Sequence, residues 1–324
     1  PTPGVEASWE DQRVHIVCSD NRNCSPVFCR YRVTRTMSRN RMIQSLFLIA
    51  VAASVMLGGL IVFSTPKGDR KWSPALAQTA VFEEVTPFTY HLKNLRRWEY
   101  AAPDEALRKD WADITVKAED LSAVWFFIEP FGGNPVFAHS LLSFVFDDGT
   151  QAPRTISVSV EARKEAGEPY SALLGALRAY ELSYVWSTEK DVLSRIAVKL
   201  DHQLFAYKLN LTHEQAMLIF DHFVKRTNAL AKKPRFYNTL HSNCTNELAK
   251  VVNEAFPKAL PWHRSWVLTG KSGKWLHDLG YVGSEGESFA ALKARSDIQS
   301  LVKATVRNDH FAQAWRAQRT PHPQ

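Results

Sequence analysis

An unbroken apolar run, LFLIAVAASVMLGGLIVF, extends from Leu46 to Phe63 and contains Ser54 as its only polar side chain. As an α-helix these 18 residues would be about 27 Å long, close to the roughly 30 Å of a bilayer core. A secretory signal peptide usually has a shorter apolar core, with a small-x-small cleavage site soon after it. Here the nearest such site, Ala75–Ala77, lies beyond a charged stretch. We therefore predict an uncleaved signal anchor over residues 37–65, with a long signal peptide or a buried core helix as the alternatives.

Positive charge flanks this run unequally. Arg30, Arg32, Arg35, Arg39 and Arg41 precede it, and Lys67, Arg70 and Lys71 follow it together with Asp69. Because cytoplasmic flanks carry the excess of Lys and Arg, we expect a cytoplasmic N-terminus and a main domain beyond the membrane. Met37–Arg41 is typical of a bacterial n-region, which predicts a single pass through the bacterial inner membrane and a periplasmic domain. Residues 1–36 lack periodicity, and we interpret them as an unstructured leader or an over-extended start.

The net charge of +7 does not by itself indicate a nucleic-acid-binding protein. Seven arginines and only four acidic residues lie in residues 1–41, so part of the excess belongs to the membrane flank, and the rest of the chain is close to neutral. A hydrophobic content of 45% with ordinary numbers of Gly (14) and Pro (16) excludes collagen-like, low-complexity and wholly disordered chains. We expect a domain with its own core and no nucleic-acid partner.

Three of the four cysteines, Cys18, Cys24 and Cys29, precede the predicted anchor. Their C-x5-C-x4-C spacing lacks the close C-x2-C pairs of structural zinc sites, so we predict no metal site and no cofactor. Cys244 is the one cysteine beyond the anchor. An unpaired thiol in an oxidising compartment is either buried and inert or reactive, and its sequence context must decide.

Beyond the predicted anchor, the first segments have residue patterns typical of β-strands. Residues 66–118 are rich in aromatic and charged residues and predict a lead-in of short strands packed on the core domain. Leu121–Glu129 predicts a buried strand that ends in a turn rich in Pro and Gly. Phe137–Phe146 and Arg154–Arg163 flank a polar loop and predict a hairpin.

The predicted hairpin has an informative register. If its loop is centred on Thr150, the numbers of opposed residues sum to 300, so His139 opposes Glu161. Directly opposed residues share a face of the sheet, with Cβ atoms roughly 5 Å apart. A bulge or a slip of one residue would separate them.

Helices dominate the second half of the chain. The patterns predict a helix at Ser171–Leu182, a short apolar run at Tyr184–Trp186, a helix start near Thr188 and a strand at Gln203–Leu209. A T-x-x-Q capping box at Thr212–Gln215 then predicts the start of a long helix. A further helix is predicted at Cys244–Phe256, with Asn243 as its N-cap. We assign residues 119–283 to the thiol-bearing domain and residues 284–324 to a polar helical tail.

Cys244 is a candidate nucleophile because it opens a predicted helix. The free N–H groups of a helix N-terminus lower the pKa of a thiol and stabilise an oxyanion on an attacked carbonyl. A cysteine nucleophile needs a base and an orienting group, and His139 with Glu161 provides both chemistries. The alternative is a small buried Cys244, an interior His139 and a solvated Glu161. His241, in the loop before Cys244, is a rival base.

Several ordered motifs resemble the bacterial Lnb N-terminal periplasmic domain family. The resemblance runs through Asp69–Pro74 (DRKWSP), Phe137–Gly149 (FAHSLLSFVFDDG), Ser159–Ser171 (SVEARKEAGEPYS), Tyr180–Val185 (YELSYV) and Asn228–Thr245 (NALAKKPRFYNTLHSNCT). It covers residues 69–255. One departure is that many relatives have N-C-T-T, whereas Asn246 follows Thr245 here.

The resemblance implies an α+β fold of the permuted papain-like type, with an antiparallel sheet, the histidine strand first and the cysteine at a helix N-terminus later. It also implies Cys244 as nucleophile, His139 as base and Glu161 as the third polar residue. We further expect substrate contacts from Asn243, Arg163 and Tyr170.

Members of the family are associated with lipoprotein N-acylation. The resemblance therefore implies acyl transfer through a Cys thioester, with a phospholipid as donor and a lipoprotein or other amine as acceptor. A papain-like hydrolase (a peptidase or cell-wall amidase) and a non-catalytic envelope-assembly protein are the alternatives.

Overall fold

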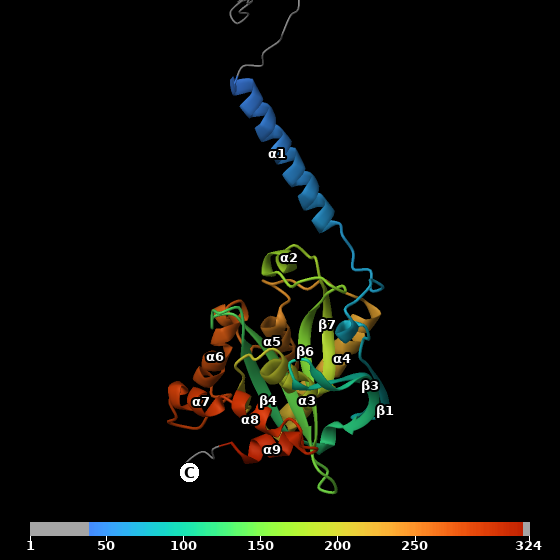
Figure 1. Cartoon of the computed structure of the whole chain (residues 1–324), viewed down its shortest axis with the longest axis vertical. Coiled ribbons are helices and arrows are strands. Elements are labelled where there is room, and N and C mark those ends of the chain that lie inside the picture. The colour runs from blue at the N-terminus through green and yellow to red at the C-terminus, as the bar shows by residue number, and fades with distance from the viewer. Residues whose placement is uncertain (1–38, 320–324) are drawn as a thin grey trace, which may run out of the picture. The chain divides into compact units, whose positions relative to one another are not determined.

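The computed structural model describes residues 39–319, which fall into two units divided between Phe63 and Ser64. In the first unit the described residues form helix α1 (Arg39–Val62) (Figure 1). The sequence predicts a membrane-spanning helix here. Within residues 39–319, however, no helix is both long enough and apolar enough to cross a bilayer.

The second unit is built around a mixed sheet of eight strands within residues 64–319. The strands are β1 (Val81–Thr86), β2 (Thr89–Ala102), β3 (Glu105–Lys117), β4 (Leu121–Pro130), β5 (Ala138–Phe146), β6 (Arg154–Arg163), β7 (Glu181–Thr188) and β8 (Phe205–Lys208). They lie in the order β1-β2-β7-β6-β5-β4-β8, and β3 pairs with β2 outside this path. All the strand pairs except the short parallel contact of β2 with β7 are antiparallel. The α+β class with a mainly antiparallel sheet is therefore confirmed.

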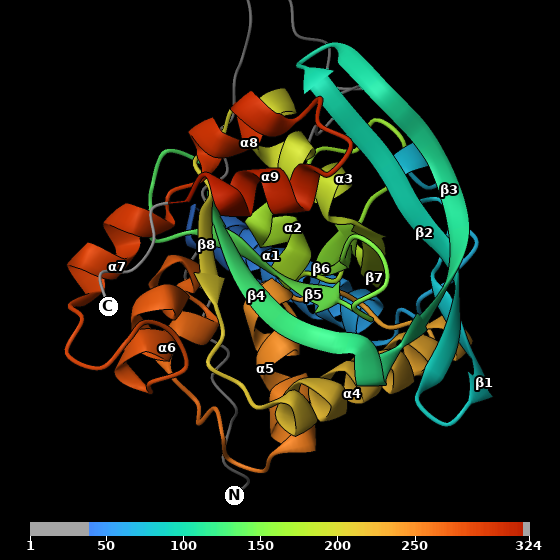
Figure 2. The same ribbon diagram turned by 90° about the horizontal axis from the view of Figure 1, so that it is seen from below.

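Helices cover both faces of this sheet (Figure 2). They are α2 (Ala172–Ala176), α3 (Glu189–Ser194), α4 (His213–Lys232), α5 (Cys244–Ala255), α6 (Ser272–Asp278), α7 (Phe289–Ser296), α8 (Gln299–Thr305) and α9 (Phe311–Ala317). Helices α4 and α5 lie on one face, and α3, α8 and α9 lie on the other. Because successive strand residues point to opposite faces, Val158 packs with α4 and α5, whereas Leu141 packs with α3, α8 and α9.

The lead-in strands are longer than the sequence predicts. Strands β2 and β3 have 14 and 13 residues and pair along most of their length, and Pro103 falls in the turn between them. Strand β3 is the exposed partner, so it tolerates the charged side chains that suggest short strands in the sequence.

The predicted β5–β6 hairpin is confirmed, including its register. Leu141 pairs with Ser159 and Phe146 with Arg154, so the numbers of opposed residues sum to 300. The strand after it begins earlier than expected. The predicted helix over Ser171–Leu182 is wrong, because α2 ends at Ala176 and residues 181–188 form β7. Arg178, at φ +60°, breaks the helix, and eight backbone pairs with β6 fix β7.

The capping predictions for the two long helices are confirmed. Thr212 and Gln215 form a reciprocal capping box at the start of α4. Asn243 is the N-cap of α5, which begins at Cys244. The N-terminus of α5 thereby lies against the start of β5, where Thr245 Oγ1 and Ser140 Oγ are 2.8 Å apart.

Candidate active site

Cys244 is the first residue of α5 and is buried, with a 6% exposed surface. It is the free cysteine among the residues that the structure describes. The N-cap before it is reciprocal, because the Asn243 side chain accepts from Asn246 N–H at 3.0 Å and the Asn246 side chain accepts from Asn243 N–H at 2.8 Å. Asn246 therefore serves as the N3 partner of the cap.

The loop before Cys244 is fixed by these asparagines. Asn243 Nδ2 donates to Thr239 O at 2.9 Å and to Trp266 O at 2.8 Å, while Asn246 Nδ2 donates to Leu240 O at 3.2 Å. The Asn243 side chain is thus fully engaged with protein groups. In the structure, Asn243 fixes the N-terminus of α5, which carries the Cys244 thiol.

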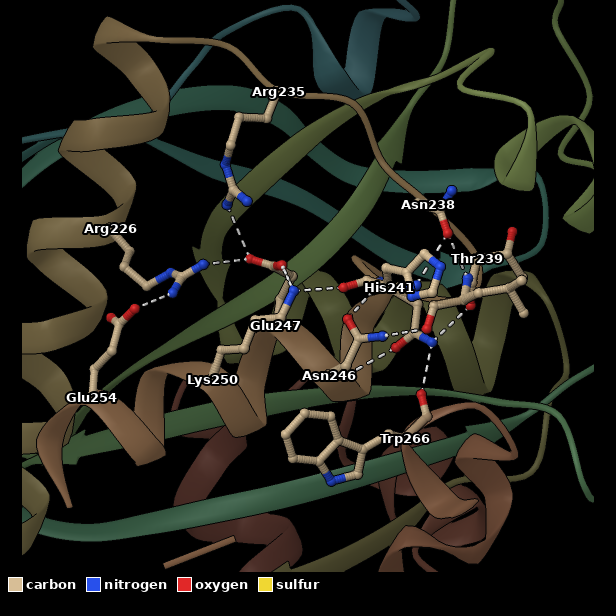
Figure 3. A network of polar contacts seen from close by, with 12 residues as sticks. Arg226, Arg235, Asn238, Thr239, His241, Asn246, Glu247, Lys250, Glu254 and Trp266 are labelled. Carbon is tan, nitrogen blue, oxygen red and sulfur yellow. Dashed lines mark hydrogen bonds and ion pairs between the residues drawn. The ribbon is translucent and has the colours of Figure 1, made fainter. Parts of the chain in front are cut away.

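Figure 3 shows a cluster of charges one turn further along α5. The buried carboxylate of Glu247 contacts Arg226 at 2.8 Å, Arg235 at 3.0 Å and Lys250 at 2.8 Å. Lys250 also donates to the carbonyl of His241 at 2.5 Å. Burial raises the pKa of Glu247, but its three cations outweigh burial and lower that pKa to about 2. The cluster ties α5 to α4 and to the loop in front of Cys244.

His139 and Glu161 lie on the neighbouring strands β5 and β6, as the register requires. His139 Nε2 is 3.3 Å from Glu161 Oε1. Ser159 lies between them: its hydroxyl is 2.6 Å from His139 Nε2 and donates to Glu161 Oε1 at 2.6 Å. The imidazole is thus oriented both directly and through a hydroxyl.

The thiol and the imidazole are neighbours. Cys244 and His139 shift each other's pKa, and Cys244 Sγ lies 3.9 Å from the carbonyl oxygen of Ala138, the residue before His139. Cys244, His139 and Glu161 therefore lie together and offer a nucleophile, a base and an orienting carboxylate.

Electrostatics favour an ion pair within this chain. Burial lowers the pKa of His139, but the Glu161 carboxylate and the Cys244 thiolate outweigh burial and hold that pKa well above its usual value. Burial raises the pKa of Cys244, but the charge and hydrogen bond of His139 bring it below that of an ordinary thiol. The pair accordingly favours thiolate and imidazolium.

Glu161 remains ionised in this setting. Burial raises its pKa, but His139, Arg195 and the Ser159 hydroxyl together hold that pKa well below the usual range. Arg195 comes from the short π-helical segment 195–199 that follows α3. A π-helical turn inside a helix is often found at a functional site.

The structure does not bring the rival base His241 to the thiol. The His241 side chain is exposed, and the loop uses its backbone: the N–H donates to Asn238 Oδ1 at 3.0 Å and the carbonyl accepts from Lys250. His139 is therefore the histidine that contacts Cys244.

Arg163 and Tyr170, the other two expected substrate contacts, both interact with other protein groups. Arg163 is buried, donates to the carbonyls of Leu76 and Ala77 at 2.9 and 2.8 Å, and lies over the ring of Trp72 at 4.4 Å. It joins the lead-in segment to β6. Tyr170 stacks on Tyr180 and is partly exposed.

Tyr237 is a site residue that sequence reasoning missed. Burial and the negative charge of Cys244 both raise its pKa, and its hydroxyl lies 3.4 Å from that of Tyr170. It therefore connects Tyr170 to the surroundings of the thiol. Tyr237 lies close to Cys244 in the sequence, within the motif Asn228–Thr245, but nothing in that pattern marked it as a site residue. Ser159, by contrast, could have been found from strand alternation, two residues before Glu161.

An apolar cavity of about 60 Å³ lies beside α5. Its lining includes Thr245, the residue after the thiol, together with Leu248, Leu142 and Trp275. Among residues 39–319 no group of three or more His, Cys, Asp or Glu side chains could hold a metal ion.

Comparisons with known proteins cover this part of the chain. A family model described as the Lnb N-terminal periplasmic domain matches residues 108–269, half of the chain, which include Cys244, His139 and Glu161. Searches of curated proteins and of solved structures gave no significant match.

Proposed function

Because the chain belongs to the Lnb N-terminal periplasmic domain family, we propose that it is a periplasmic thiol enzyme of the permuted papain-like type, which transfers acyl groups through a thioester on Cys244. The observation that supports this proposal is the grouping of Cys244, His139 and Glu161, in which His139 lies 3.3 Å from Glu161 and lowers the pKa of the Cys244 thiol. The same arrangement of thiolate, imidazolium and orienting group activates cysteine nucleophiles on other folds.

In the first half-reaction the Cys244 thiolate attacks the carbonyl carbon of a lipid ester. The backbone N–H of Cys244, at the start of α5, stabilises the oxyanion. As the ester C–O bond breaks, the His139 imidazolium gives its proton to the departing alcohol oxygen. The products are a thioester on Cys244 and a lysolipid.

In the second half-reaction an amine attacks the thioester carbonyl. His139, now neutral, takes a proton from the attacking nitrogen while the C–S bond breaks and the Cys244 thiolate is restored. The product is an amide, and no cofactor is consumed. Glu161 stabilises the imidazolium in both steps and keeps the ring oriented.

The donor we propose is a phospholipid, and the acceptor is the terminal amine of a lipoprotein. The apolar run Leu46–Phe63 supports a membrane address for the chain, with the second unit in the periplasm.

The test is to trap the acyl group. The full chain in phospholipid vesicles, without acceptor, should gain the mass of one acyl group on the peptide that holds Cys244, and a lipopeptide amine should remove it. Cys244→Ala should abolish both the adduct and the amide product, whereas His241→Ala should retain them. Amide formation by Cys244→Ala would refute the assignment, and rapid loss of the adduct to water would favour a hydrolase.

A further inference from the structure

Exposed leucines gather on α2 and on the loop in front of Cys244. The exposed fractions are 70% for Leu173, 42% for Leu174, 43% for Leu177 and 49% for Leu240. Leu173 and Leu177 lie one turn apart along the helix and its C-cap. We call these four side chains the leucine patch. Contiguous apolar patches are uncommon on soluble monomers and mark surfaces that meet a partner or a membrane.

The leucine patch is joined rigidly to the loop that leads to the thiol. Thr239 Oγ1 donates to Ala172 O at 2.7 Å, and Asn238 Nδ2 donates to Ala176 O at 3.0 Å. The packing at Gly175 is so close that a Cβ there would lie 2.6 Å from Thr239 Oγ1. Helix α2 and the loop 238–243 are therefore packed and hydrogen-bonded together.

Lysines border the same end of the unit. The N–H groups of Lys67 and Gly68 donate to Glu181 at 2.7 and 3.2 Å, and Gly68 packs on Pro234, directly after Lys232 and Lys233. The side chains of Lys67, Lys71, Lys232 and Lys233 are exposed, and Asp69 is the exposed acidic residue among residues 67–71. Glu181 bridges to Phe236, two residues before the loop that holds α2. Exposed lysines therefore lie at the same end of the unit as the leucine patch, together with the partly exposed Glu165 and Glu168 before α2.

We propose that the leucine patch is a membrane-contact surface, which inserts between the headgroups of an anionic bilayer while the lysines pair with lipid phosphates. Aliphatic side chains that protrude beside lysines fit the boundary between headgroups and acyl chains. Protein hot spots are instead enriched in Trp, Tyr and Arg. In the sequence, the apolar run Leu46–Phe63 ends shortly before Lys67, one of the lysines near the leucine patch.

The membrane contact also bears on acyl transfer at Cys244, and this step rests on the proposed function. With the leucine patch in the headgroup layer, the partly exposed residues 238–242 that lead to the buried Cys244 lie at the lipid surface. The membrane contact thereby brings a phospholipid ester to the entrance of the site.

The experiment uses the full chain in vesicles of equal parts phosphatidylethanolamine and phosphatidylglycerol that contain a photoactivatable diazirine phospholipid. Mass spectrometry maps the adducts formed on illumination. We expect adducts on residues 173–177 and on Leu240 several-fold more often than on Val85. Val85 is a matched control, since it is 62% exposed and lies on β1, towards the other end of the unit from α2 (Figure 1).

A double variant tests the surface itself. Leu173→Ser with Leu177→Ser should reduce the adduct on Leu240 several-fold, whereas Val85→Ser should leave it unchanged; circular dichroism confirms that both variants fold. Equal labelling of Val85 and the leucine patch would overturn the proposal. So would self-association, measured by sedimentation, that the double variant abolishes while lipid adducts are absent, because a second copy would then be the occupant.

The labelling is independent of the acyl chemistry. Cys244→Ala should keep the adducts on the leucine patch, so a failure of the proposed thiol mechanism leaves the lipid contact measurable. Conversely, loss of labelling with intact thioester formation would reject the lipid contact alone.

Discussion

His139 on β5 and Glu161 on β6 lie 3.3 Å apart, with the hydroxyl of Ser159 bonded to both. Their contact follows from a hairpin register in which opposed residue numbers sum to 300. A slip of one residue would turn one of the two side chains to the other face of the sheet. The register of this hairpin therefore decides whether Cys244 has an oriented base.

The first prediction concerns the reactivity of Cys244 towards iodoacetamide. Because His139 lowers the pKa of the thiol and the thiol raises that of the imidazole, the ion pair exists between the lowered thiol pKa and the raised imidazole pKa. Alkylation of the Cys244 peptide, followed by mass spectrometry against pH, should remain fast below the pH at which ordinary thiols protonate. In His139→Ala the rate at pH 7 should fall about tenfold or more, since each pKa unit changes the thiolate fraction tenfold. An unchanged profile would show that the two groups are not coupled.

Glu161→Gln tests the orienting carboxylate. The neutral amide removes the charge that stabilises the imidazolium, so the pKa of His139 should fall and the thiolate should require a higher pH. We expect the alkylation profile to shift to higher pH, with a smaller shift for Ser159→Ala. NMR titration of the His139 ring reports the pKa itself, and a rise in that pKa would contradict the arrangement.

Glu247 should make the free energy of unfolding depend on pH in the acidic range. Its pKa falls from 4.5 to about 2 on folding, so its contribution is fully present above about 4.5 and is lost as the pH falls towards 2. Glu247→Gln should lower the free energy of unfolding at pH 7 by up to about 3 kcal/mol, because it removes a buried carboxylate from three cations. Arg226 keeps its ion pair with Glu254, and Arg235 and Lys250 stay partly solvated, which reduces the cost. Urea unfolding at pH 7 and at pH 3 measures this, and the difference between variant and wild type should be smaller at pH 3.

Asn246→Ala should affect both stability and reactivity. It removes the reciprocal cap and the bond to Leu240 O, which should cost about 1 kcal/mol in urea unfolding. Gln215→Ala is the matched control, because it breaks the same type of capping box at the start of α4, away from the thiol. Both variants should lose similar stability, but Asn246→Ala alone should slow alkylation of Cys244. Equal rates in the two variants would mean that the cap does not position the thiol.

The local features of the site were predictable because they depend on neighbours in the chain. Strand alternation and loop length gave the β5–β6 register and hence the His139–Glu161 pair. Asn243 before an amphipathic run gave the start of α5 at Cys244. Helix propensity misplaced the segment after Ser171, because backbone pairing with β6 stabilises β7 more than local propensity favours a helix.

The amino-acid sequence by itself determined the register of the β5–β6 hairpin, the capped starts of α4 and α5, and the family. Only the tertiary structure decided that α5 packs against β5 so that Cys244 reaches His139 rather than His241. It also set the α2 leucines beside the loop that leads to the thiol. The physical reason is that register and capping follow from residues a few positions apart, whereas the contacts of α5 with β5 and of α2 with the loop join residues 105 and 67 positions apart and arise only when buried faces pack together.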